Sequence, residues 1–243
     1  MSNVLFVGKD LPDSLDFAET LAKNNRKVFT TEKLNSETTN FESANIFKAA
    51  WNRSSAISSR ALIINAEAKI PPVNEFIVYF DSYYYASKFN QDRPEEISLA
   101  IDTMITSYQL FINELLFRLE QKKDDAIITF LVRTEPSKAD ILKNAKKTPN
   151  QRGTSNVVNA AQSAFISFAE NIATLVNDKA YLSVLLAQCN AQNELYDDEK
   201  KLAEWVCQSM DAINGQKNHQ SVKQALSWVK AGGKVTGGFP FFK

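Results

Sequence analysis

Three consecutive tyrosines, Tyr83, Tyr84 and Tyr85, closely follow the apolar run at residues 75–80 (EFIVYF). Aromatic rings grouped in this way can stack on a base or on another flat ligand. They can equally fill space in a protein, because tyrosine buries well while its hydroxyl stays wet. We favour the space-filling role, since an aromatic cluster alone is a weak indication of a binding site.

Other residue types that perform catalysis are sparse. His219 is the only histidine and lies in a polar stretch, which argues against a Ser-His-Asp triad or a histidine-based zinc site. Cys189 follows an apolar run, as is typical of a small buried side chain rather than a nucleophile. The basic stretch between residues 143 and 152 predicts a solvated loop, and a phosphate contact is the weaker alternative. We therefore expect no metal site.

Composition excludes several classes of partner. Lys and Arg total 28 and Asp and Glu total 28, so no net field draws the molecule to nucleic acid or to an anionic membrane. Only two cysteines occur, which suits the cytoplasm. The first residues carry no basic leader, and no apolar run reaches the roughly 18 residues of a membrane span. With 44% hydrophobic residues, we expect one domain over residues 1–243.

Strands and helices alternate along the predicted fold. A strand at residues 3–7, a helix with Leu15, Ala18 and Leu21 on one face, and a strand at 27–31 form one crossover unit. Residues 45–51 could be strand or helix, and we favour strand. Further strands are predicted at residues 75–80, 126–132 near the sheet centre, and 181–187, with helices at 58–68, 94–119, 156–176, 198–211 and 220–230. This alternation indicates a doubly wound, mostly parallel sheet with helices on both faces.

Three local matches point to a known family. They are the first turn after Val7, the helix that begins Pro94-Glu95-Glu96 and includes Ile101-Asp102, and the helix from Ser163-Ala164-Phe165 to Ile172-Ala173. Together with the order of elements, they resemble the short-chain dehydrogenase/reductase family. The resemblance implies a three-layer α/β/α Rossmann-like fold, NAD or NADP as cofactor, and a homodimer or homotetramer formed through helices 97–119 and 156–176. The stretch between the second and third strands is shorter than in the family.

The first turn departs from the family pattern. The resemblance implies Gly-x-x-x-Gly-x-Gly there, but this chain reads Gly8-Lys9-Asp10-Leu11-Pro12-Asp13-Ser14. Pro12 removes an N–H donor, and Asp10 and Asp13 bring negative charge, which Lys9 could partly offset. We hypothesise that Asp10 or Asp13 caps the following helix where a cofactor phosphate would lie. The weak cofactor-binding candidates that the resemblance implies are Gly8, Lys9, Asp81, Ser82, Tyr83 and Tyr84.

The catalytic positions that the resemblance implies are a Tyr-x-x-x-Lys pair, a serine and an asparagine. Counted back from Ile172-Ala173, the tyrosine position falls on Val158 and the lysine position on Gln162. The serine position falls at residues 131–133, with Val132 in the middle, and the asparagine position on Met104. None of the four residues can carry its family role, so we expect no standard catalytic site.

Another Tyr-x-x-x-Lys string occurs at Tyr84 and Lys88, but it precedes the long helix and cannot stand on the helix that presents the family's pair. We therefore expect a catalytically degenerate homologue, a pseudoenzyme that acts as a binding or scaffold protein. The alternative is an NAD(P)-dependent oxidoreductase with a relocated proton donor at Tyr83, Tyr84 or Lys88. A third possibility is an enzyme that binds another nucleotide or coenzyme in the same crevice.

Overall fold

The computed structural model describes residues 2–33, 43–89, 93–144, 154–216 and 227–234. The strands are β1 (Ser2–Val7), β2 (Arg26–Glu32), β3 (Ile46–Ala50), β4 (Glu75–Asp81), β5 (Ala126–Thr134), β6 (Leu182–Asn190) and β7 (Val229–Lys230). The helices are α1 (Leu15–Lys23), α2 (Ala56–Lys69), α3 (Ser82–Lys88), α4 (Pro94–Ile101), α5 (Ser107–Lys122), α6 (Lys138–Asn144), α7 (Asn156–Leu175) and α8 (Glu199–Gln216), with a π-helical segment, η1 (Asp102–Thr106), between α4 and α5.

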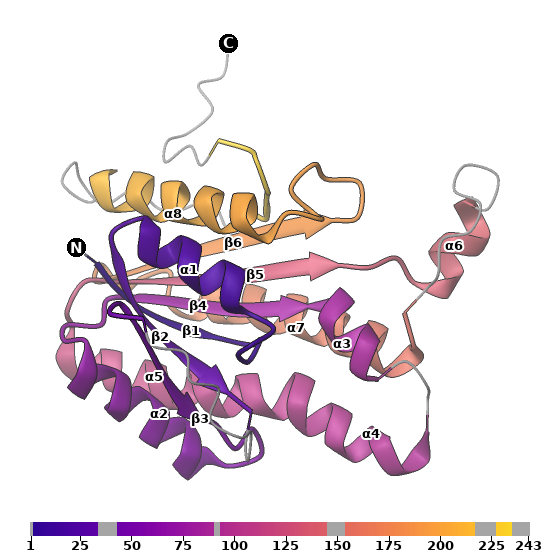
Figure 1. Ribbon diagram of the computed structural model, residues 1–243, viewed down its shortest axis with the longest axis horizontal. Coiled ribbons are helices and arrows are strands. Elements are labelled where there is room, and N and C mark those ends of the chain that lie inside the picture. The colour runs from indigo at the N-terminus through magenta and orange to yellow at the C-terminus, as the bar shows by residue number, and fades with distance from the viewer. Residues whose placement is uncertain (1, 34–42, 90–92, 145–153, 217–226, 235–243) are drawn as a thin grey trace.

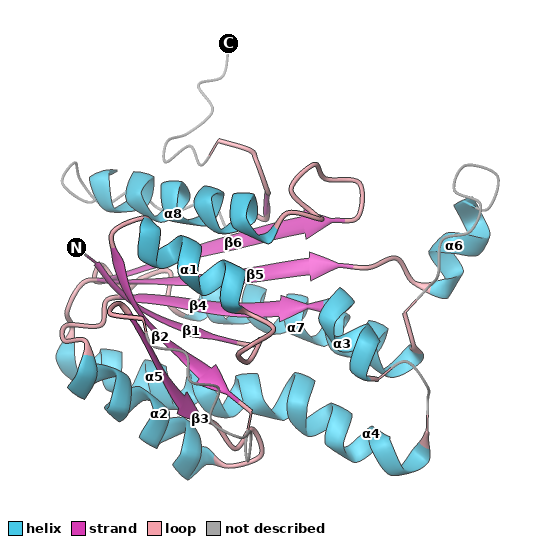
Figure 2. Ribbon diagram, in the orientation of Figure 1, coloured by secondary structure: helices cyan, strands magenta, loops and turns pink. Residues whose placement is uncertain are grey.

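All strands of the described residues belong to one parallel sheet with the order β3-β2-β1-β4-β5-β6-β7. The chain builds outward from β1 in one direction and then from β4 in the other, which is the arrangement of a doubly wound sheet. Figure 2 shows the strands between two groups of helices. The predicted three-layer α/β/α Rossmann-like fold is confirmed, and β5 lies next to the central strand β4 as expected.

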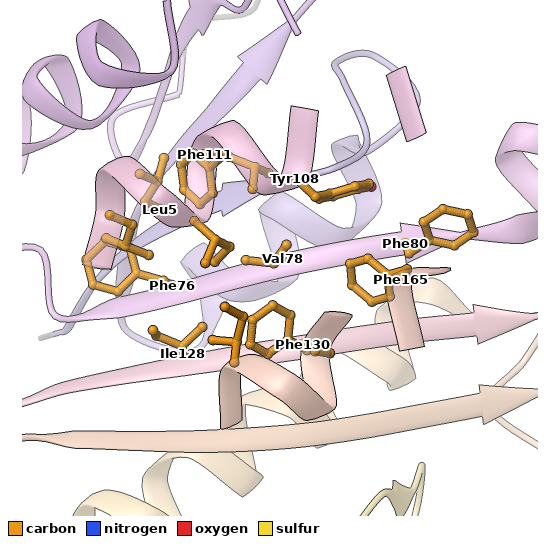
Figure 3. Packing of buried hydrophobic residues seen from close by; sticks show 14 of the residues in the cluster. Leu5, Phe76, Val78, Phe80, Tyr108, Phe111, Ile128, Phe130 and Phe165 are labelled. Carbon is orange, nitrogen blue, oxygen red and sulfur yellow. The ribbon is translucent and has the colours of Figure 1, made fainter. Parts of the chain in front are cut away.

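Helices cover both faces because successive side chains of a strand point to opposite sides. On one face, Leu5, Val78 and Phe130 pack against helices α2, α5 and α7 (Figure 1 and Figure 3). On the other face, Phe6 and Tyr79 pack against α1 and α8. The strands are apolar on both faces, which explains the unbroken hydrophobic runs that predict them.

Most predicted elements agree with the structure, including the strand at residues 45–51 and the helix that starts at Pro94. The predicted continuous helix at 94–119 is interrupted by the π-helical segment, for which the sequence carries no evident signal. The predicted helix at 220–230 is wrong in its described part. Val229 and Lys230 instead form β7, because the open edge of β6 offers backbone partners at Ala187 and Gln188. Among the described residues, no helix is long and apolar enough to cross a membrane.

A buried ion pair joins the amino ends of β2 and β4. The Arg26 Nε donates to Glu75 Oε2 at 2.7 Å, and Arg26 Nη2 donates to Asp211 Oδ1 of α8 at 2.6 Å. Burial raises the pKa of Glu75, although Arg26 acts in the opposite direction. Arg26 supplies the partner without which the buried carboxylate of Glu75 would be costly. The hydrogen bond from Arg26 to Asp211 also links α8 to the sheet.

Gly8 allows β1 to approach β4 closely at the carboxyl edge of the sheet. Its φ is +122°, a conformation that side-chain-bearing residues rarely adopt. A Cβ atom at Gly8 would lie 1.8 Å from the Tyr79 carbonyl oxygen and 3.0 Å from the Tyr108 hydroxyl. The one glycine that the first turn retains is therefore required by packing inside the protein.

We expect Gly8→Ala to lower the free energy of unfolding by about 3 kcal/mol, because it adds both backbone strain and a steric clash. Urea denaturation followed by circular dichroism measures this change. The control is Gly215→Ala in α8, where no atom lies within 4 Å of the new Cβ. The control should stabilise the protein by up to about 1 kcal/mol through helix propensity. Equal stability of the two variants would contradict the packing role of Gly8.

Candidate functional site

The candidate site lies at the carboxyl ends of β1, β4 and β5, where open parallel sheets bind their ligands. The turn between Gly8 and Ser14 follows β1, and α3 starts directly after β4 with Asp81 as its N-cap. The Asp81 Oδ1 accepts a hydrogen bond from the Tyr84 N–H at 3.1 Å. Asp81, Ser82 and Tyr83 thus stand at the beginning of a short helix.

The backbone of the first turn is hydrogen-bonded to the protein itself. The Leu11 N–H donates to the Thr31 carbonyl at 2.8 Å, and Pro12 has no N–H. The Ser14 N–H donates to the Asp10 carbonyl at 3.2 Å and the Leu15 N–H to the Pro12 carbonyl at 3.0 Å. The amides of Leu11, Ser14 and Leu15 are therefore already engaged, and Pro12 offers none.

The hypothesis that Asp10 or Asp13 caps α1 is wrong. Ser14 is the N-cap of α1 and makes no side-chain capping hydrogen bond. Asp10 instead accepts from Thr31 Oγ1 at 2.5 Å, and Asp13 forms an ion pair with Lys33 at 3.2 Å. Both carboxylates bind cations or hydroxyls from neighbouring segments, which the local sequence pattern could not reveal.

Arg53 occupies the space beside the first turn. Its Nη2 donates to Asp10 Oδ1 at 2.9 Å and to the Gly8 carbonyl at 3.2 Å, and its guanidinium lies 4.6 Å from the centre of the Trp51 ring. Burial acts to raise the pKa of Asp10, but Arg53 and Thr31 outweigh burial and hold that pKa below its usual value. Sequence reasoning missed Arg53, because nothing in the polar segment around it signals a contact 43 residues away.

Four charged side chains form a second network at the start of α8. Lys9 pairs with Asp81 at 3.4 Å and also with Glu199. Arg133 donates to Asp81 Oδ1 at 2.9 Å and lies 3.5 Å from Glu199. Burial acts to lower the pKa of Arg133, but neighbouring groups including Asp81 and Glu199 raise it. The network therefore contains two cations and two carboxylates at the carboxyl edge of the sheet.

The acidic residues at the start of α8 have two roles. Residues 197–199 are acidic and lie at the start of this helix, where negative charge complements the helix dipole. Asp198 does so, since its Oδ1 accepts from the Lys201 N–H at 3.0 Å. Glu199 instead forms ion pairs with Lys9 and Arg133, and no local sequence pattern indicates these contacts.

The tyrosine cluster divides into buried and exposed members. Tyr85 is fully buried, and its hydroxyl donates to the Gly8 carbonyl at 2.8 Å. The Tyr108 hydroxyl donates to the Tyr79 carbonyl at 2.7 Å and lies 2.8 Å from the Tyr85 hydroxyl. Tyr84 is also buried, whereas Tyr83 is 60% exposed. The space-filling prediction therefore holds for Tyr84 and Tyr85, and only Tyr83 offers an open ring.

The positions that the family resemblance assigns to the catalytic residues carry side chains that cannot exchange a proton. Met104 lies in η1, Val132 in β5 and Val158 in α7, and all three are buried among apolar groups. Gln162 accepts a hydrogen bond from Ser82 Oγ at 2.6 Å and one from the Glu135 N–H at 3.1 Å. Its amide therefore holds α7 against the ends of β4 and β5.

Tyr84 and Lys88 lie on one face of α3, not on α7, and Lys88 Nζ donates to the Tyr84 hydroxyl. Burial raises the pKa of Tyr84, and the nearby Asp10 adds to this shift. Burial, together with Lys33, lowers the pKa of Lys88 to about 8. The two side chains are in contact, but the lysine does not lower the pKa of the Tyr84 phenol toward neutrality.

The remaining candidates are buried thiols or lie largely outside the described residues. Cys189 and Cys207 are buried, and burial raises their pKa values to about 11 and 12. His219 and most of the basic stretch at 143–152 lie outside the described residues. Within the described segments, no cluster of His, Cys, Asp and Glu side chains could hold a metal ion.

Comparison with known proteins agrees with this architecture. No protein-family model and no curated protein matches the chain. Among solved structures, it is similar to a 3-ketoacyl-(acyl-carrier-protein) reductase from Brucella melitensis complexed with NADH, with 12% identity, a TM-score of 0.58 and coverage of 94% of this chain and 96% of that one. Serine dehydrogenase from Escherichia coli matches with 13% identity, a TM-score of 0.60 and coverage of 84% and 90%.

A third similar structure is a short-chain dehydrogenase/reductase from Serratia marcescens, with 12% identity, a TM-score of 0.56 and coverage of 85% of this chain and 89% of that one. These similarities extend over most of each chain. The chain therefore has the Rossmann-type fold of the short-chain dehydrogenases/reductases.

Proposed function

We propose that this protein is a noncatalytic relative of the short-chain dehydrogenases/reductases that acts as a binding or scaffold protein. The observation that carries the proposal is the first turn, in which three of the amides and the adjoining space are taken by the chain's own groups. Phosphate binding at a helix start depends on backbone N–H groups that point to the ligand. Here the amides of Leu11, Ser14 and Leu15 serve carbonyls of the protein.

The charge of the turn contributes less than the engagement of these three amides. Asp10 would repel a phosphate, but its ion pair with Arg53 offsets much of that repulsion. A pyrophosphate that displaced Arg53 would break its contacts with both Asp10 and the Gly8 carbonyl. A buried carboxylate would then lose its partner, which costs about 3 kcal/mol or more.

Proton transfer is also poorly supported. The family's tyrosine position is the buried Val158, and a relocated donor at Tyr84 has a pKa shifted away from neutrality. A general acid or base works best with a pKa near the working pH. The raised pKa of Tyr84 counts against this phenol as the proton donor of the alternative oxidoreductase, for which Tyr83 and Lys88 are the other candidates.

We expect neither NADH nor NADPH to bind saturably up to millimolar concentration. Isothermal titration calorimetry and the fluorescence of the reduced nicotinamide measure binding, and an active dehydrogenase under the same conditions is the positive control. Saturation at micromolar concentration would contradict the proposal and favour the oxidoreductase. A thermal shift with a different nucleotide or coenzyme, but not with nicotinamides, would indicate a third class of function.

We also propose that the chain forms a homodimer or homotetramer through residues 97–119 and 156–176. Apolar side chains exposed on these segments support the proposal. The most exposed are Leu99 of α4 at 61%, Phe117 of α5 at 60% and Leu175 of α7 at 63%. An oligomer would bury such side chains against a second copy, as a symmetric interface requires.

We expect Leu99→Glu to raise the dissociation constant of the oligomer by about a hundredfold or more, because a carboxylate would be buried in the interface. Sedimentation velocity across a concentration series measures this change. Ile57→Glu is the matched control, because Ile57 is 80% exposed on α2, outside both segments. A wild-type chain that sediments as a monomer at micromolar concentration would disprove the interface.

A further inference from the structure

The π-helical segment η1 turns apolar side chains of α4 away from the core. The sequence spacing places Ile101, Ile105 and Tyr108 on one apolar face of a continuous helix. In the structure, Ala100 and Met104 are buried instead, while Ile101 is 40% exposed. A π turn contains one extra residue, which rotates the residues before it by about 100° relative to those after it. The isoleucines of α4 therefore lie on the surface.

The wide turn of η1 satisfies its own backbone groups. The Ser107 N–H donates to the Asp102 carbonyl, five residues earlier. The Thr103 carbonyl, which would accept this N–H in an α-helix, accepts from the Ser107 hydroxyl at 2.7 Å instead. Both carbonyls therefore have a donor, and the wide turn is a stable part of the fold. Turns of this kind occur frequently at functional sites.

A small hollow opens beside η1, between α5 and α7. Its floor includes Met104, Tyr108 and Phe165, and its rim includes Ile105, Ala164 and Phe168. The floor is held in place, because the Tyr108 hydroxyl donates to the Tyr79 carbonyl and the Tyr108 ring meets that of Phe165 edge-on, with 5.0 Å between their centres (Figure 3).

The size of the hollow limits what can enter it. Even with the space that opens to solvent, it measures about 190 Å³. Pockets for small-molecule ligands measure roughly 300–1,000 Å³. The hollow is therefore suited to the end of one apolar side chain and is too small for a cofactor.

The surface around the hollow is suited to a second copy of the chain. The adjoining helix α7 is nearly uncharged, since Glu170 is the only charged residue between positions 156 and 176, and its carboxylate accepts from Trp228 Nε1 at 2.8 Å. On α4, Ile97 and Ile101 are 39% and 40% exposed. The buried centre of a protein interface is likewise poor in charge and rich in apolar groups.

We propose that the hollow beside η1 receives the Ile101 side chain of a second copy of this chain. The inference rests on the proposed oligomer and names the contact that aligns the two copies. Ile101 immediately precedes η1 and lies one turn from Ile105 at the rim, so a two-fold axis beside the hollow brings it to the hollow of the other copy. Each copy then gives one isoleucine and accepts one, as knobs enter holes between packed helices.

Ala164→Leu tests the hollow from inside, because the longer side chain fills it. We expect the dissociation constant of the oligomer to rise at least about tenfold, with no loss of resistance to urea. Ile101→Ala should raise the dissociation constant by a similar factor, because the inserted side chain is lost. Sedimentation velocity measures both changes. Ala68→Leu, at an exposed position of α2 outside the proposed interface, is the matched control and should leave association unchanged.

The double variant Ala164→Leu/Ile101→Ala separates a specific insertion from a general loss of packing. The added leucine side chain takes the space that the shortened isoleucine leaves, so the double variant should associate more tightly than Ala164→Leu alone. Additive losses would overturn the insertion of Ile101.

Failure of this contact is distinguishable from failure of the proposed oligomer. A wild-type oligomer that Leu99→Glu dissociates, but that neither Ala164→Leu nor Ile101→Ala weakens, would overturn the contact and leave the proposed interface intact. The hollow would then have a different occupant. A wild-type chain that remains a monomer would overturn both.

Discussion

The backbone of Gly8 is the point on which the carboxyl edge of the sheet depends. Its carbonyl accepts hydrogen bonds from Tyr85 of α3 and from Arg53, which follows β3. Its Cα faces the Tyr79 carbonyl, which Tyr108 of α5 also contacts. Segments far apart in the sequence therefore meet around one residue without a side chain. The space beside this glycine is filled by the protein's own groups.

The layered frame could be predicted from the sequence because each element carries its own local signal. Apolar runs such as the one at 126–132 predict strands covered on both faces, and the spacing of Leu15, Ala18 and Leu21 predicts a helix. The sequence at 45–51 alone was compatible with a strand or a helix, and its pairing with β2 shows that it forms a strand. The two-residue strand β7 was mistaken for a helix, because it is too short to show a period and depends on the edge of β6.

The candidate site was less predictable, because it consists of contacts between distant residues. Arg53 meets Asp10, and Arg133 meets Asp81 over 52 positions, and no local pattern marks either pair. The assignment of the family's catalytic positions to Met104, Val158 and Gln162 rests on the resemblance and stays a prediction. The contacts made at this edge of the sheet could not be predicted from the sequence, because burial and ion pairing decide where Asp10 and Glu199 point.

The network of Lys9, Asp81, Arg133 and Glu199 has a consequence for selectivity at this edge of the sheet. An anion that approached the two cations would have to compete with carboxylates already bound to them. Separating such a pair leaves a desolvated charge behind, a penalty that few surface contacts can recover. This edge of the sheet is therefore better suited to contact with a neutral or aromatic group than with a phosphate or a carboxylic acid.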